Sequence, residues 1–128
     1  MYLAGRIAAS TPTETSAYAG AGALVIKSRL KMFTPSTKIP LKAGFTAAGN
    51  AFSKHGNRAG SKFPKIIGNV ANKNKIGAEL VQEILSNPNS KLTYRHHAMF
   101  GDIAEIYAPN GRGLRYRRSD LLFIGFIE

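Results

Sequence analysis

The feature that most constrains the fold is the pattern of residues 91–128, where short segments rich in aliphatic and aromatic residues alternate with turn residues. Ala108-Pro109-Asn110-Gly111 is a strong hairpin signal, and Ser119-Asp120 is a weaker turn signal. These signals separate the later segments and predict an antiparallel sheet. The candidate strands span residues 91–96, 102–108, 112–117 and 121–127.

Helices are predicted before this sheet. Residues 20–33 form one candidate helix, and Thr46 can cap a second, short helix that Gly56 ends. The clearest helix spans about residues 74–86, because apolar residues recur there every four positions. These residues are Ile76, Leu80 and Ile84. The fold class is therefore α+β, with N-terminal helices packed on a small twisted antiparallel sheet.

The chain divides by composition into two parts. Residues 1–43 are rich in Ala, Gly, Ser and Thr, and we interpret them as a helical lead-in or linker. Residues 44–128 are interpreted as the functional domain. No stretch approaches the about 20 apolar residues that a membrane span needs. The chain has no cysteine, which excludes disulfides, thiolate zinc sites and cysteine nucleophiles.

Charge indicates the class of partner. The 18 Lys and Arg residues against seven Asp and Glu give a formal net charge of +11. No acidic residue lies between Glu14 and Glu79, a span that holds nearly all the lysines. A field of one sign over such a length attracts polyanions. Nucleic acid is favoured over an acidic protein as the main partner. The alternative interpretation is that the basic residues only keep the protein in solution.

Several kinds of chemistry have no signal in the sequence. The scattered acids form no paired-carboxylate signature, and there is no Walker loop, dinucleotide fingerprint or H-E-x-x-H motif. His96 and His97 are adjacent, so a regular strand points them to opposite faces and they do not easily share one metal ion. A His-Asn metal nuclease that uses one of them with Asn110 is a weaker alternative.

Two clusters of residues suit metal-free cleavage of RNA. That reaction needs a base for the 2′-hydroxyl, an acid for the departing 5′-oxygen and cations around the phosphorane. Period-two alternation places Thr93, Arg95 and His97 on one strand face, where they offer a hydroxyl, a guanidinium and an imidazole. The second cluster follows the short helix and consists of Lys54, His55, Arg58 and Ser61.

Each of these residues also has a purely structural interpretation. A histidine after a helix is commonly a cap, which is the alternative role for His55. Tyr94 and Tyr116 are at least as well explained as core or rim aromatics. Strand alternation also puts Arg115 on the opposite face from Arg112 and Tyr116, so these three residues do not form one row.

The same segments resemble a known family. They are K-H-G-N-R-A-G-S-K-F-P (54–64), T-Y-R-H-H-A-M-F-G (93–101), A-P-N-G-R-G-L-R-Y (108–116) and F-I-G-F-I-E (123–128). Together they resemble the C-terminal toxin modules of bacterial polymorphic toxins, which contact-dependent growth inhibition and Rhs-type proteins carry. The resemblance covers about residues 44–128. It extends to the barnase–EndoU–colicin–RelE ribonuclease fold class, in which N-terminal helices pack on an antiparallel sheet.

The resemblance implies an activity and a biological setting. It implies a metal-independent ribonuclease, without a cofactor, that cuts tRNA near the anticodon and leaves a 2′,3′-cyclic phosphate. A cognate, acidic immunity protein would hold it inactive. Residues 1–43 would be the lead-in from a larger toxin that is secreted or displayed at the cell surface. The domain would act in the cytoplasm of the target cell.

The motifs of the family carry over by position. K-H-G-x-R-x-G-S falls on the second cluster, T-x-R-x-H falls on the first cluster, and G-R-G-x-R-[FY] falls on Arg112, Arg115 and Tyr116. Two departures are present. Met99 stands where such modules often have Arg, and Arg117-Arg118-Ser119-Asp120 replaces the usual D-G turn.

We therefore predict His55 and His97 as the acid/base pair, with neither role assigned. Arg95 and Arg58 are predicted to hold the scissile phosphate, and the residues predicted to position it are Ser61, Thr93 and Tyr116. The predicted RNA-binding residues are Lys54, Lys62, Lys65, His96, Arg112 and Arg115. A non-enzymatic basic RNA-binding module and a metal-dependent DNase toxin are the alternatives.

Overall fold

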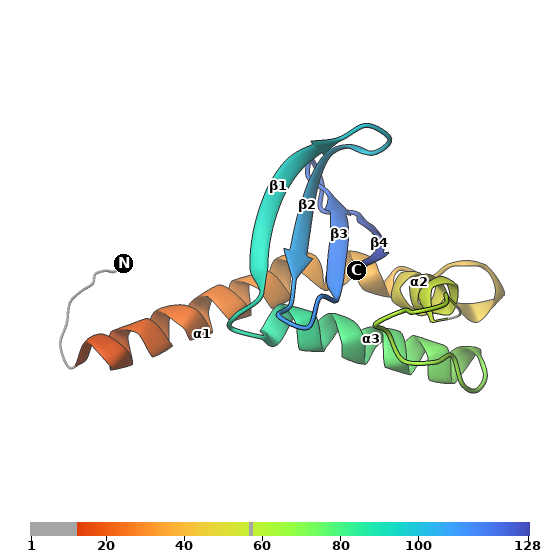
Figure 1. Ribbon diagram of the computed structural model, residues 1–128, viewed down its shortest axis with the longest axis horizontal. Coiled ribbons are helices and arrows are strands. Elements are labelled where there is room, and N and C mark those ends of the chain that lie inside the picture. Colours follow the sequence, from red (N-terminus) through yellow and green to blue (C-terminus); the bar gives the residue numbers. More distant parts are fainter. Residues whose placement is uncertain (1–12, 57) are drawn as a thin grey trace.

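A computed structural model of the chain describes residues 13–56 and 58–128 (Figure 1). Its helices are α1 (Thr13–Phe33), α2 (Ala47–His55) and α3 (Val70–Ser86), with two short 3-10 helices, η1 (Pro35–Lys38) and η2 (Lys42–Gly44), between α1 and α2. The strands are β1 (Lys91–His97), β2 (Gly101–Tyr107), β3 (Gly113–Arg117) and β4 (Phe123–Ile127).

The strands form one antiparallel sheet in the order β1-β2-β3-β4. Figure 1 shows this sheet rising from a base that α1 and α3 form, with the β1–β2 turn at its far end. The predicted α+β class and the predicted strands are confirmed. None of the helices in the described ranges combines the length and hydropathy that a membrane span requires.

Capping side chains set where the helices begin. Thr46 caps α2 as predicted, and its Oγ1 accepts a hydrogen bond from the Gly49 N–H at 3.0 Å. Asn69 caps α3, where its Oδ1 accepts from the Asn72 N–H at 2.9 Å. The helix α3 therefore starts at Val70, earlier than its apolar periodicity indicated. The helix α1 is already present at Thr13, the first residue of the described range, rather than near residue 20.

Gly56 ends α2 for a different reason from the one expected. Its φ of −64° lies in the ordinary right-handed region, so no left-handed glycine cap is present. A Cβ at this position would lie 2.5 Å from Cγ1 of Ile66 and 2.8 Å from the carbonyl oxygen of Pro64. Glycine is therefore required here because the following loop crosses the end of the helix closely.

Both predicted turns are confirmed. The Gly111 N–H donates to the Ala108 carbonyl at 3.0 Å, and the φ of Gly111 is +88°, which favours glycine. This turn joins β2 to β3. In the β3–β4 turn, Arg117 Nε donates to Asp120 Oδ1 at 2.9 Å. The turns set the pairing of the strands, and a register shift between Arg115 and Tyr116 interrupts the pairing of β3 with β4.

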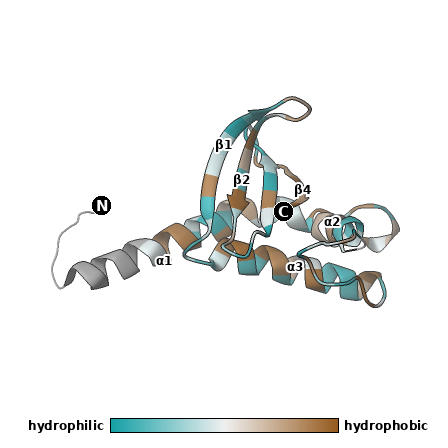
Figure 2. Cartoon of the chain, viewed as in Figure 1, coloured by the Kyte–Doolittle hydropathy of each residue, from teal (hydrophilic) through white to brown (hydrophobic). Residues whose placement is uncertain are grey.

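One face of the sheet packs on the helices and forms the core. Leu92, Ile106, Leu114 and Phe126 share a row across the four strands and pack with the buried residues of α3. Hydrophobic and hydrophilic bands alternate along α3 in Figure 2, as expected for a helix with one buried side. The opposite face, which carries Thr93, Arg95, His97, Glu105 and Arg115, is called the open face below.

Tyr116 lies in this core. The side chain is wholly buried, and its ring centroid is 4.8 Å from that of Phe33. Its hydroxyl donates to the Phe33 carbonyl at 2.7 Å, which joins the end of α1 to β3. Phe33 and Thr37 are both about as buried as the rest of the core, so residues before position 44 contribute to it. The division at residues 43 and 44 stays a prediction.

The hydrogen bond between Tyr116 and Phe33 provides a test of the core. Tyr116→Phe removes the hydroxyl and leaves a buried carbonyl without its partner, so the free energy of unfolding should fall by about 1–3 kcal/mol. Urea denaturation measures this change. Tyr94→Phe is the matched control, because Tyr94 is 50% exposed and its loss of a hydroxyl should leave stability unchanged. Equal midpoints for both variants would contradict the assigned role of Tyr116.

Candidate active site

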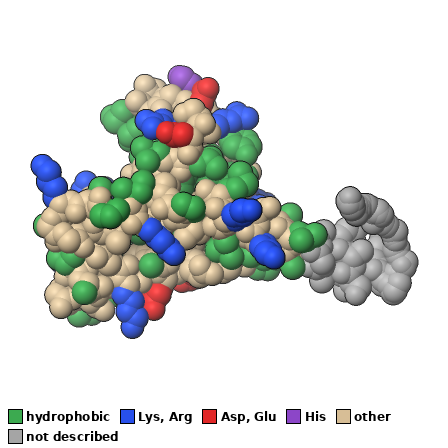
Figure 3. Space-filling view, turned by 180° about the vertical axis from the view of Figure 1, so that it is seen from behind, with side chains coloured by type: hydrophobic (Ala, Val, Ile, Leu, Met, Phe, Trp, Pro, Cys, Tyr) green, Lys and Arg blue, Asp and Glu red, His purple; other side chains and the backbone are tan. Residues whose placement is uncertain are grey.

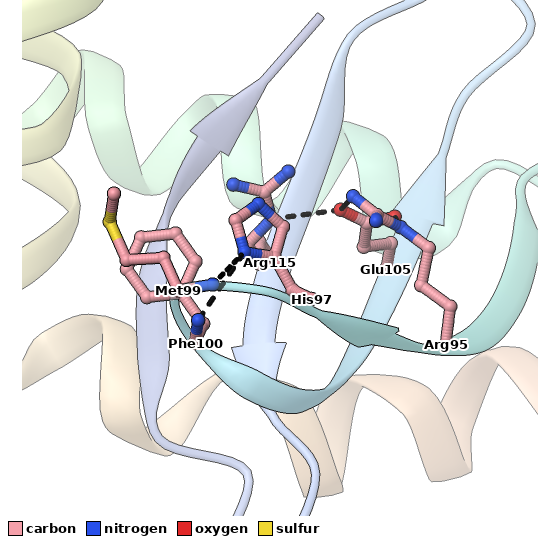
Figure 4. Close-up of polar contacts among 6 residues, drawn as sticks. All are labelled: Arg95, His97, Met99, Phe100, Glu105 and Arg115. Atoms are coloured by element: carbon pink, nitrogen blue, oxygen red, sulfur yellow. Dashed lines mark hydrogen bonds and ion pairs between the residues drawn. The ribbon is translucent and has the colours of Figure 1, made fainter.

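An Arg–Glu–Arg cluster lies at the centre of the open face (Figure 4). The Glu105 side chain is only 4% exposed, and its Oε1 accepts from Arg95 Nε at 2.8 Å. Its Oε2 accepts from Arg115 Nε at 2.8 Å and from Arg95 Nη2 at 3.2 Å. Burial of a carboxylate is costly unless it is paired and hydrogen-bonded, and here both conditions are met.

The charge of this cluster follows from those contacts. Burial alone would raise the pKa of Glu105, but the hydrogen bonds and charges of Arg95 and Arg115 hold that pKa below its ordinary value. The carboxylate is therefore ionised at neutral pH. Since Arg115 donates to it through Nε, the terminal nitrogens of that guanidinium are left for another anion. The cluster of Arg95, Glu105 and Arg115 therefore carries one positive charge in excess.

His97 lies beside this cluster, at the end of β1. Its Nδ1 accepts from the Met99 N–H at 3.0 Å and from the Phe100 N–H at 3.3 Å. A nitrogen that accepts these bonds carries no proton, so Nε2 holds the proton of the neutral ring. The Phe100 ring lies 4.8 Å from the His97 ring and 5.4 Å from Arg115 Cζ. Phe100 thus links the imidazole to the arginines.

A groove of about 560 Å³ runs between α2 and β4. One wall is a single face of α2, formed by Ala47, Asn50, Ala51 and Lys54, and the other wall is β4. We call this pocket the α2–β4 groove. Gly125 of β4 pairs with Arg115 of β3, and the space above Gly125 is open. Arg115 and Phe100 therefore line the groove as well as the open face.

His55 lies at one end of the groove. The residue is 8% exposed, and its Nδ1 is 3.4 Å from Glu128 Oε2. The same carboxylate accepts from Ser61 Oγ at 3.1 Å and from the Lys62 N–H at 2.6 Å. The hydrogen bonds from the Lys62 amide, His55 and Ser61 lower the pKa of Glu128, while burial raises it. The Lys62 amide makes the largest contribution to that lowering.

The surroundings favour the neutral form of His55. Burial lowers its pKa first, and the nearby charge of Arg58 lowers it further. Glu128 and the backbone of Phe126 act in the opposite direction, but the pKa remains below the ordinary value for histidine. A neutral imidazole is able to accept a proton near neutral pH. The end of the groove therefore contains a group suited to general base chemistry.

The structure brings most of the predicted catalytic residues into two connected groups. Thr93 pairs with Glu105 and lies on the open face with Arg95 and His97. Lys54, His55 and Arg58 line the groove, and Ser61 reaches it through Glu128. Tyr116 belongs to neither group. Strand alternation places it on the helix-packed face, where its side chain is buried and its hydroxyl donates to the Phe33 carbonyl.

The predicted RNA-binding residues are more dispersed. Arg115 joins the two groups, whereas Arg112 donates to the Lys62 carbonyl at 2.8 Å and lies 3.6 Å from Glu83. Lys62 and Lys65 are exposed in the loop between α2 and α3. His96 lies on the other side of β1 from His97 and pairs with Asp102 at 2.9 Å. Arg112 and His96 therefore already have protein partners.

Sequence reasoning missed four residues of this region, which are Asn50, Phe100, Glu105 and Glu128. Glu105 had a detectable signal, because it is an acid within the apolar strand segment D-I-A-E-I-Y. Glu128 had no detectable signal in the sequence, because its contact with His55 joins positions that are 73 residues apart. Within the described ranges, no group of three or more metal-ligating side chains of His, Asp or Glu is present.

Comparison with known proteins gives two matches. The family described as the CdiA C-terminal tRNase toxin domain matches residues 34–128. A crystal structure of the toxic C-terminal tip of CdiA from Pseudomonas aeruginosa, in complex with immune protein, is similar with a TM-score of 0.63 and 28% sequence identity. The similarity covers 73% of this chain and 98% of that chain. No curated protein sequence is recognisably similar to this chain.

The charge of Arg58 provides a test of the environment of His55. Arg58→Ala removes a positive charge that opposes protonation, so the pKa of His55 should rise toward the ordinary value. Histidine resonances followed by NMR across a pH series measure this pKa. Lys65→Ala is the control, because Lys65 is exposed and does not line the groove. A pKa of His55 that is the same in the wild type and in Arg58→Ala would contradict this account.

Proposed function

The chain belongs to the family of CdiA C-terminal tRNase toxin domains, and we propose that it cleaves tRNA without a metal ion where the open face meets the α2–β4 groove. Membership of this family makes the chain an endoribonuclease toxin. The location of the site, the residues that act in it and the chemistry of the cut are the proposal. One observation carries it: Arg115 and Phe100 belong both to the groove that holds His55 and to the cluster beside His97.

The proposed reaction is a transesterification within the RNA. A base removes the proton of the ribose 2′-hydroxyl, and the 2′-oxygen attacks the adjacent phosphorus. The bond from phosphorus to the 5′-oxygen breaks, and an acid gives that oxygen a proton. The products are a 2′,3′-cyclic phosphate and a free 5′-hydroxyl. The lowered pKa of His55 favours the base role for His55. His97 would then act as the acid in its doubly protonated form, in which Nδ1 carries a proton and no longer accepts from the Met99 and Phe100 N–H groups.

Positive side chains would stabilise the phosphorane. Arg95 and Arg115 are already ordered by Glu105, so little reorganisation is needed when negative charge develops. Arg58 and Lys54 extend the positive charge along the groove. Thr93 and Ser61 contribute hydroxyl groups near the two ends of this region. The overall charge of +11 favours a polyanion too, and on the face drawn in Figure 3 more Lys and Arg than Asp and Glu side chains lie over the helical base.

The biological setting completes the proposal. The P. aeruginosa CdiA tip is bound to its immune protein, and we propose that a cognate acidic immunity protein neutralises this chain. Complementary charge would speed that association. Residues 1–43 would connect the domain to a larger parent toxin, and the domain would act on tRNA near the anticodon in the cytoplasm of the target cell.

Cleavage in the presence of a chelator tests the metal-free chemistry. Purified protein incubated with total bacterial RNA in excess EDTA should convert tRNA into discrete fragments near half length. Denaturing gels and sequencing locate the cut. New 3′ ends that resist ligation after phosphatase alone, and that ligate after treatment with polynucleotide kinase, report the 2′,3′-cyclic phosphate. Cleavage that EDTA abolishes and Mg²⁺ restores would contradict metal independence. Cleavage of DNA in place of tRNA would contradict the substrate.

Histidine substitutions test the acid/base assignment. His55→Ala and His97→Ala should each lower the rate of tRNA cleavage by at least about 100-fold, because each removes a proton-transfer group. Both variants should still bind tRNA, since the arginines remain. His96→Ala tests the neighbouring ring, which faces away from the cluster and should be dispensable for the chemical step. A normal rate for His55→Ala or His97→Ala would refute the role of that residue.

A further inference from the structure

We propose that the α2–β4 groove holds one unstacked nucleobase of the tRNA, with Asn50 hydrogen-bonded to the edge of the base, and so selects the nucleotide at the cleavage site. The inference rests on the proposed tRNase function and adds a subsite to the same region. Neither the family match nor the sequence motifs assign a role to this part of the groove.

The groove has two chemically different ends. The two ends of β4 are held by separate contacts: the Phe123 N–H donates to Ser36 Oγ at 3.0 Å, and Glu128 contacts His55. Helix α2 runs alongside from Ala47 to His55. Along both walls, the end of the groove near Ser36 is therefore distant from the end that contains His55, the proposed general base.

The end near Ser36 is apolar. Ile39, Leu41 and Leu122 line it, and their exposed fractions of 41%, 43% and 37% are high for large aliphatic residues. The backbone holds the first two residues in place, because the Ala47 N–H donates to the Ile39 carbonyl at 2.9 Å and the Leu41 N–H donates to the Phe45 carbonyl at 2.7 Å. Exposed apolar residues gathered in one pocket indicate a ligand with an apolar surface.

Asn50 lies between the two ends. It occupies the groove face of α2, and the small side chains of Ala47 and Ala51 flank it. Among the described residues, the Asn50 amide side chain makes no hydrogen bond within the protein. An amide offers a donor and an acceptor side by side, which is the arrangement that pairs with the edge of a nucleobase.

The other end is cationic. Lys54 and Arg58 line it together with His55, and Arg115 adds a positive charge at the middle of the groove, opposite Gly125. A nucleotide has the same polarity, with an apolar base face at one end and an anionic phosphate at the other. A base placed near Leu41 and Leu122 therefore directs its phosphate toward His55 and Arg115. Sequence-specific recognition of RNA commonly uses bases that are withdrawn from the stack in this way.

The test uses short RNA stem-loops that reproduce the mapped cleavage site. Each of the four bases, and an abasic residue, is placed in turn on either side of the scissile phosphate, and kcat/KM is measured. The wild type should prefer one base by about tenfold or more and should lose this advantage on the abasic RNA. Asn50→Ala should reduce the preference to within about threefold and should cleave the abasic RNA as the wild type does.

Two further variants complete the design. Leu41→Ser should lower the ratio of kcat/KM for base-containing RNA to kcat/KM for abasic RNA, because it makes the apolar wall polar. Ile67→Ala is the matched control, since Ile67 is 68% exposed and does not line the groove, and it should keep the wild-type pattern. Retention of the wild-type base preference by Asn50→Ala would overturn the proposal.

A binding measurement separates this inference from the proposed function. Uncleavable stem-loops with a 2′-deoxy residue at the mapped site, or at each anticodon-loop position if no cut is found, are titrated by fluorescence anisotropy. Base-containing RNA should bind more tightly than abasic RNA, and Asn50→Ala should remove the difference. Absence of tRNA cleavage by the wild type would refute the proposed function. Equal binding of base-containing and abasic RNA would refute the nucleobase pocket.

Discussion

The candidate site depends on the buried carboxylate of Glu105. Arg95 and Arg115 lie on the same face of the sheet, where their two guanidinium groups would repel each other without a negative charge between them. The carboxylate between them provides hydrogen bonds to both and leaves one positive charge in excess. The arginines are thereby ordered before substrate arrives. A preorganised cation stabilises developing phosphorane charge better than side chains that must first be collected from solvent.

Strand β4 connects that cluster to the rest of the site. Ser36 holds its first residue, and His55 contacts Glu128 just after its last residue, so the strand forms one wall of the groove along α2. Gly125 lies midway and has no side chain, which leaves Arg115 accessible from the groove. A strand with a large residue at that position would separate the open face from His55. The edge strand thus joins two groups of residues that come from opposite ends of the domain.

The local parts of the fold were predictable from the sequence. Thr46 caps its helix, Gly111 adopts the positive φ of a turn, and alternation places Thr93 and His97 on one face. The predictions failed where one signal was read alone. The helix α3 starts at Val70, after its cap Asn69, rather than near its first periodic apolar residue. Gly56 is required because a Cβ there would meet Pro64 and Ile66, and its φ is ordinary. A local cap decided the first outcome, and the loop that crosses the end of α2 decided the second.

The sequence by itself determined the α+β class, the strands and their parity, the basic character and the two groups of motif residues. These properties follow from turn residues, side-chain period and charge, which act over a few positions or over the whole surface. Only the tertiary structure decided that Tyr116 is a core residue, that Glu105 pairs with two arginines and that Glu128 meets His55. These contacts join distant segments, and their partners are chosen by how the helices and the sheet pack together.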